Sequence, residues 1–134
     1  MSPTAATIRL TLHVLAACIW VGGQVVLGAL VPLLRSTEGM TKKAARAFNR
    51  IAWPAFAVLI VTGMWNLTEV DITDAPTDYQ VTVFVKIFVA VIAGAAAAVH
   101  IAAKNKLALA LGGAIGLIAS LAAVFLGVLL RTGR

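Results

Sequence analysis

Four long apolar runs constrain this chain more than any other feature of its sequence. They cover residues 10–34, 51–67, 81–103 and 107–130. Each is near the roughly 20 residues that an α-helix needs to cross a bilayer, where a helix satisfies its own backbone polar groups. At 61% hydrophobic and 12% charged residues, the chain also has too much apolar surface for one small soluble core. The sequence therefore predicts an all-α, polytopic integral membrane protein, a single domain of four transmembrane helices over residues 1–134.

The flanking residues set the expected helix limits. We expect helices at about residues 8–34, 47–68, 80–103 and 107–130. Lys43, Arg46 and Arg50 recur at helical spacing before Pro54, so the second helix is expected to start in the membrane interface near Thr41 and to bend at the proline. The first run is longer than the roughly 7–15 apolar residues of a secretory signal, and we expect it to stay in the mature protein.

Basic residues predict the orientation, because short cytoplasmic loops collect Lys and Arg. The first and third connectors hold seven of the eleven basic residues: Arg35, Lys42, Lys43, Arg46, Arg50, Lys104 and Lys106. The middle connector holds Asp71, Asp74 and Asp78 without a basic residue. Although Arg9, Arg131 and Arg134 favour the opposite orientation, they are fewer. We therefore expect a multi-pass protein of the cell membrane with both termini outside, whose net charge of +6 needs no nucleic-acid partner.

Ionisable residues inside the apolar runs are the main functional signal, since a bilayer disfavours them. His13 lies about 5 Å down the first helix from Leu10, and Lys86 lies about 7.5 Å down the third helix from Val81, at about 1.5 Å per residue. The second helix arrives at that level from the other side with Thr62 and Asn66. These four residues are predicted to line one polar pocket in the outer half of the bundle.

Other polar and aromatic residues extend that face or compete with this interpretation. Arg9 lies one turn above His13, and Trp20 lies about two turns below it on nearly the same face. His13 could instead make only a structural hydrogen bond, and Lys86 could snorkel to the interface. His100 lies about 21 Å deeper than Lys86, so we expect it to act independently of His13 as an interfacial or hydrogen-bonded residue.

The segment Leu12–Gly23, LHVLAACIWVGG, resembles the first-helix signature of the copper-resistance protein D (CopD) membrane family. Residues 46–52, 61–66 and 85–87 are also similar, so the resemblance covers about residues 12–106. It implies copper handling, in uptake or tolerance, at an outer-half site around His13. Because copper(I) prefers thiolate, thioether and imidazole ligands, His13 and Met64 are the candidate copper ligands.

The arrangement of four helices and their polar residues also resembles the HemJ-type protoporphyrinogen oxidases. These carry a first-helix His followed by Trp, a third-helix Lys, and bound haem. That likeness implies a haem b site with His13 and Lys86, to which Trp20 and Asn66 would contribute. A third alternative is an accessory subunit, without a ligand, that packs on a larger membrane complex or on copies of itself through small-residue seams. No nucleophile, carboxylate pair or phosphate-binding motif suggests catalysis without a cofactor.

Overall fold

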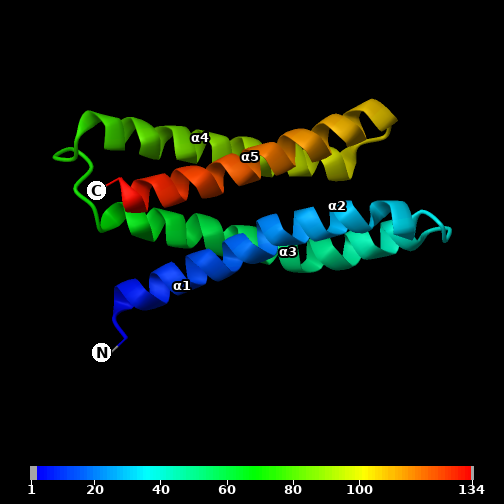
Figure 1. The fold of residues 1–134 in the computed structure, drawn as a ribbon, viewed down its shortest axis with the longest axis horizontal. Helices are drawn as coiled ribbons and strands as arrows, with labels where there is room; N and C mark the ends of the chain where they lie inside the picture. Colours follow the sequence, from blue (N-terminus) through cyan, green and yellow to red (C-terminus); the bar gives the residue numbers. More distant parts are fainter. Residues whose placement is uncertain (1–2, 134) are drawn as a thin grey trace. The chain divides into compact units, whose positions relative to one another are not determined.

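The computed structural model describes residues 3–133, and these residues form helices and loops without a strand (Figure 1). Four helical segments in this range are long and apolar enough to cross a membrane: Ala5–Leu34, Met40–Thr68, Thr77–Ala102 and Lys106–Thr132. The all-α class with four membrane-length helices is therefore confirmed. Of the basic residues weighed above for orientation, Arg134 lies outside the described range.

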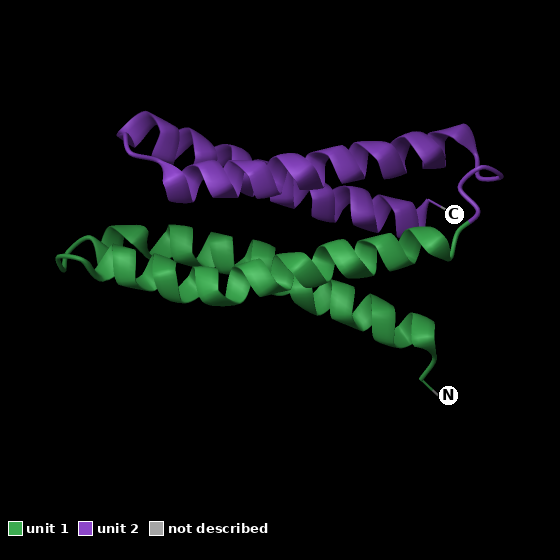
Figure 2. Cartoon of the chain, turned by 180° about the vertical axis from the view of Figure 1, so that it is seen from behind, with its two compact units in different colours: residues 1–70 green, residues 71–134 purple. Residues whose placement is uncertain are grey.

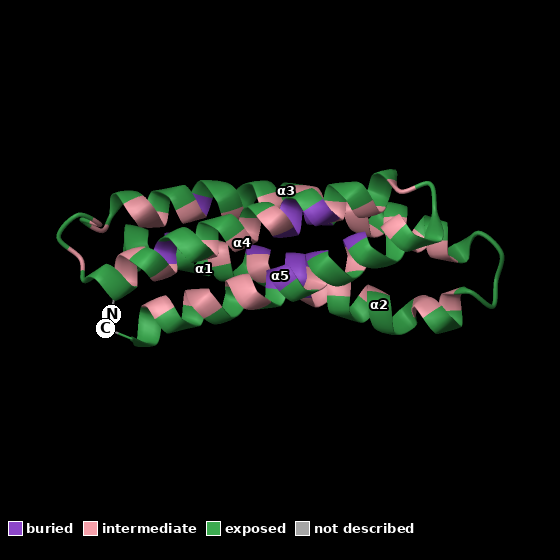
Figure 3. Ribbon diagram, turned by 90° about the horizontal axis from the view of Figure 1, so that it is seen from above, coloured by how far each residue is buried: buried purple, intermediate pink, exposed green. Residues whose placement is uncertain are grey.

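The chain divides into two compact units, Met1–Val70 and Asp71–Arg134 (Figure 2). In both units the helices expose large apolar side chains, including Leu33 at 69%, Phe88 at 65% and Phe125 at 67% (Figure 3). Surfaces of this kind are suited to lipid. We describe each unit by itself, and the expectation of one domain stays a prediction.

Unit 1 is a helical hairpin. Its first arm consists of α1 (Ala5–Ala17), a π-helical turn η1 (Cys18–Gly22) and α2 (Gly23–Leu34), and its second arm is α3 (Met40–Thr68). Gly39, at φ 73°, precedes α3 in the left-handed region, where glycine is favoured because it lacks a Cβ. The second helix thus starts at Met40 rather than near residue 47, in agreement with an interfacial start near Thr41. Pro54 lies inside α3.

The π-helical turn is followed by a tight contact between the two arms of unit 1. A Cβ added at Gly23 would collide with the ring of Phe48 on α3, whereas a Cβ at Gly22 would meet nothing within 4 Å. Trp20, within the turn, is 4% exposed and its carbonyl accepts a 3.0 Å hydrogen bond from Gln24 Nε2. Gly23 is therefore needed for packing, whereas Gly22 is not.

Unit 2 is a second hairpin, in which α4 (Thr77–Ala102) packs against α5 (Lys106–Thr132). A Cβ at Gly112 would lie 2.9 Å from the backbone nitrogen of His100 and 3.0 Å from the carbonyl oxygen of Ala96. The small residues therefore allow close backbone contact between α4 and α5. The side chain of Asn105 caps α5 by accepting a 2.7 Å hydrogen bond from the Ala108 amide.

The segment between α3 and α4 carries its own hydrogen bonds. The Asp71 carboxylate accepts from the hydroxyl of Thr73 at 2.7 Å and from its amide at 3.2 Å. The hydroxyl contact is the main cause that lowers the pKa of Asp71 from its ordinary value. Asp71 is therefore held as a carboxylate in this connector.

Candidate functional site

His13 projects from α1 onto α3. Its Nδ1 atom lies 2.7 Å from Oγ1 of Thr62, and its Cε1 atom lies 3.7 Å from the position that a Cβ on Gly63 would occupy. Thr62 is 3% exposed and His13 is half-buried. The prediction that Thr62 reaches the level of His13 is confirmed, and a Cβ at Gly63 would make only an ordinary contact with the ring.

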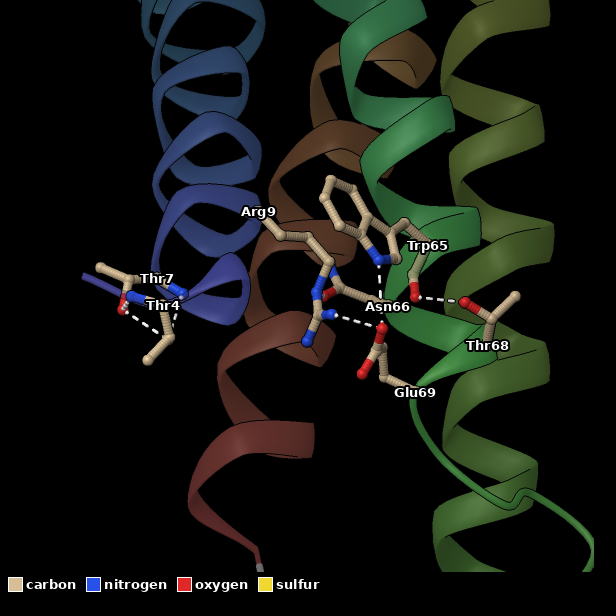
Figure 4. A network of polar contacts seen from close by, with 7 residues as sticks. All are labelled: Thr4, Thr7, Arg9, Trp65, Asn66, Thr68 and Glu69. Atoms are coloured by element: carbon tan, nitrogen blue, oxygen red, sulfur yellow. Dashed lines mark hydrogen bonds and ion pairs between the residues drawn. The ribbon is translucent and has the colours of Figure 1, made fainter. Parts of the chain in front are cut away.

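Arg9 and the C-terminal end of α3 form a polar cluster one turn from His13 (Figure 4). The Nε of Arg9 donates to Oδ1 of Asn66 at 2.7 Å, and its Nη1 lies 3.2 Å from Oε1 of Glu69. Trp65 places its ring 5.6 Å from the Arg9 guanidinium and donates from Nε1 to Glu69 at 3.1 Å. Asn66 thus bonds to Arg9, which is 8% exposed, and fixes this guanidinium.

Trp20 lies in an aromatic cluster with two residues of α3. Its ring centroid is 5.6 Å from that of Trp53 and 4.5 Å from that of Phe56. The two α3 rings are in turn 5.8 Å apart. The cluster packs η1 against α3, so Trp20 has a structural role here, and its contact with a cofactor stays a prediction.

Met64 faces a different direction from Thr62. It is 63% exposed, whereas Thr62 is 3% exposed. Two positions along a helix correspond to a rotation of about 200°, which explains the contrast.

Among residues 3–133, no group of three or more His, Cys, Asp or Glu side chains is placed to hold a metal ion. The only cysteine, Cys18, is exposed. The donor set around His13 therefore gives little support to a copper site within one chain.

Lys86 belongs to unit 2, where it is half-buried. Its Nζ and Cε atoms lie 3.3 and 3.5 Å from the position of a Cβ on Gly127, so the end of the side chain lies over this glycine of α5. Because the units are described separately, the predicted pocket shared by Lys86 and His13 stays a prediction. The snorkelling alternative also stays open.

His100 makes a hydrogen bond within unit 2, which agrees with the predicted role of a hydrogen-bonded residue. Its Nδ1 lies 2.6 Å from the carbonyl oxygen of Leu109. A Cβ on Gly113 would lie 3.0 Å from the same nitrogen, so this glycine makes room for the ring. The imidazole links the end of α4 to the start of α5.

Comparison with known protein families, with curated proteins and with solved structures finds no match for this chain. The CopD and HemJ likenesses therefore remain resemblances of short motifs. Sequence reasoning did not identify the partners that Arg9 finds in Glu69 and Trp65, or those that Trp20 finds in Trp53 and Phe56. The spacing of four between Trp65 and Glu69 is the one local signal for that cluster, since it places both on one face of α3.

Proposed function

We propose that this chain is a membrane-embedded haem-binding protein in which His13 supplies the axial ligand. The observation that carries the proposal is the 2.7 Å hydrogen bond between Nδ1 of His13 and Oγ1 of Thr62 on α3. A histidine oriented through one ring nitrogen by an outer partner is the usual arrangement when the other nitrogen binds a metal.

The residues around His13 fit haem better than copper. Haem needs an imidazole ligand and apolar surroundings, and His13 on α1 is the proposed ligand. Copper(I) favours several soft ligands, but Met64 is 63% exposed and Cys18 is also exposed. When bound, haem would supply one-electron redox chemistry.

Other residues have supporting roles in the proposal. Thr62 positions the His13 ring, and Asn66 holds Arg9 one turn away. The Lys86 ammonium is the proposed partner of an anionic group on the edge of the haem. In the proposal Trp20, which is held in its aromatic cluster, would contribute apolar surface to the site.

Copper handling is the second candidate, favoured by the resemblance of Leu12–Gly23 to the CopD signature. It would require further copper ligands, in addition to His13, from a second copy or a partner protein. An accessory subunit would bind neither haem nor copper. In each case we place the protein in the cell membrane with both termini outside, on the distribution of basic residues.

Absorption spectroscopy and elemental analysis of the detergent-purified chain test the proposal. Haem binding predicts a Soret band and iron close to one atom per chain, while copper handling predicts copper without that band. If the wild-type protein, expressed with ample haem and copper, contains neither and co-purifies with a membrane partner, the accessory alternative replaces both.

A further inference from the structure

We infer that Thr62 is a positioning residue that accepts a hydrogen bond from His13 and thereby fixes the tautomer of the ring, with the hydrogen on Nδ1. The tautomer follows from the hydrogen bonds of unit 1 alone. Only its consequence for a ligand rests on the proposed haem function.

Thr62 has a single hydroxyl proton. Oγ1 lies 2.6 Å from the carbonyl oxygen of Val58, one turn earlier on α3, and 3.4 Å from that of Leu59. A carbonyl oxygen can only accept, so the hydroxyl is the donor in these contacts. Its proton is thus directed along α3 and away from His13.

The contact between Thr62 and His13 then has a preferred direction. Oγ1 lies 2.7 Å from Nδ1, and its one hydrogen is directed at the Val58 carbonyl. We therefore assign Nδ1–H as the donor to the hydroxyl oxygen. The other neutral tautomer would set the lone pairs of Nδ1 and Oγ1 against each other at this distance. At a site where Thr62 is 3% exposed, that repulsion would have little relief from water.

A fixed Nδ1–H tautomer places the lone pair of the neutral ring on Nε2. This is the form of histidine that binds a metal through Nε2. Loss of such an outer partner typically lowers metal affinity or activity about 10–100-fold. We therefore expect Thr62→Val to weaken haem binding by about that factor and to raise the midpoint potential, because the ring becomes a poorer electron donor.

The first experiment measures the tautomer without haem, by ¹⁵N NMR of histidine-labelled protein at about pH 8, above the ordinary histidine pKa of about 6.5. Protonated and lone-pair ring nitrogens have well-separated shifts. Wild type and Thr62→Ser should show His13 with a proton on Nδ1, and Thr62→Val should show a mixture or the Nε2–H form. His100 is an internal control. Its Nδ1 faces the Leu109 carbonyl, which can only accept, so the neutral ring should carry its hydrogen on Nδ1 in every variant.

Two results would overturn the inference: Nε2–H in wild-type protein, or an unchanged His13 tautomer in Thr62→Val. If the valine variant does not fold, as judged by a changed His100 signal, Thr62→Ala removes the same hydroxyl with less bulk. The same two outcomes apply to it.

The second experiment titrates haemin into the wild type and these variants. The expected order of affinity is wild type, then Thr62→Ser, then Thr62→Val, with the highest midpoint potential in the valine variant. Equal affinity and potential in Thr62→Val and wild type would contradict the positioning role. If no variant binds haemin although NMR shows the Nδ1–H tautomer, the haem proposal fails and the tautomer assignment stands.

Discussion

Arg9 and Asn66 are 57 positions apart in the sequence, and the Nε of Arg9 donates to Oδ1 of Asn66 at 2.7 Å. His13 and Thr62, each one helical turn further into unit 1, form the next polar contact between the same arms at 2.7 Å. The antiparallel course of α1 and α3 accounts for both pairs, because four residues forward on one helix match four residues back on the other. Unit 1 is therefore held by two successive polar contacts at one end.

The contact with Asn66 should matter more for stability than the ion pair with Glu69. Arg9 is 8% exposed, and Asn66→Ala would leave its guanidinium without a close neutral acceptor, at a cost of about 1.5–3 kcal/mol. The Glu69 side chain is 51% exposed, so Glu69→Gln should cost at most about 1 kcal/mol. Denaturant unfolding in detergent micelles measures both variants. An equal or larger loss for Glu69→Gln would contradict this ranking.

Two glycines of α5 should respond differently to alanine. At Gly112 a Cβ would lie 2.9–3.0 Å from backbone atoms of α4, which cannot move aside locally, so Gly112→Ala should cost about 1–3 kcal/mol. At Gly116 the nearest atoms would lie 3.6–3.8 Å away, an ordinary contact. Gly116→Ala should be neutral or stabilising, since alanine is the better helix former by up to about 1 kcal/mol. Thermal unfolding of the two variants checks this, and similar losses in both would refute the close contact at Gly112.

Cysteine labelling in intact cells tests the orientation. In a Cys18→Ala background, Asp74→Cys should react with an impermeant maleimide from outside, and Lys43→Cys only after the cells are opened. Both parent residues are exposed, so reagent access within the protein is not limiting. The reverse pattern would place both termini in the cytoplasm.

Lys86→Met tests whether the ammonium contributes to the haem site. The substitution keeps an unbranched apolar stem and removes the charge, so haem affinity should fall while Lys86→Arg retains most of it. Gly127→Leu should have a similar effect by displacing the lysine end, since a Cβ there would lie 3.3 Å from Nζ. Unchanged haem binding in Lys86→Met would leave snorkelling as the role of this residue.

The sequence predicts part of this structure because lipid leaves few alternatives to long helices. The four membrane-length helices and the contact between His13 and Thr62 follow from apolar length and helical rise. The partner of Asn66 was harder to predict from the sequence. Arg9 and His13 lie one turn apart on the same face of α1, and small shifts between α1 and α3 decide which of them Asn66 meets. The exposed side of Met64 could have been predicted from its two-residue separation from Thr62.

Other features depend on packing that a single sequence does not specify. The π-helical turn at Cys18–Gly22 is marked in the sequence only by the adjacent glycines, and the Phe48 ring packs beside Gly23 directly after it. The direction of the Thr62 hydrogen bonds required the Val58 carbonyl position.

The most direct test of the central claim is chemical rescue of a His13→Gly variant. Its cavity should admit free imidazole, which can replace the missing ligand if His13 binds the haem iron. We predict that the Soret band of wild-type protein is lost or shifted in His13→Gly and restored by added imidazole, while His100→Gly retains the wild-type spectrum without it. A His13→Gly variant that keeps the wild-type haem spectrum in the absence of imidazole would contradict His13 as the axial ligand.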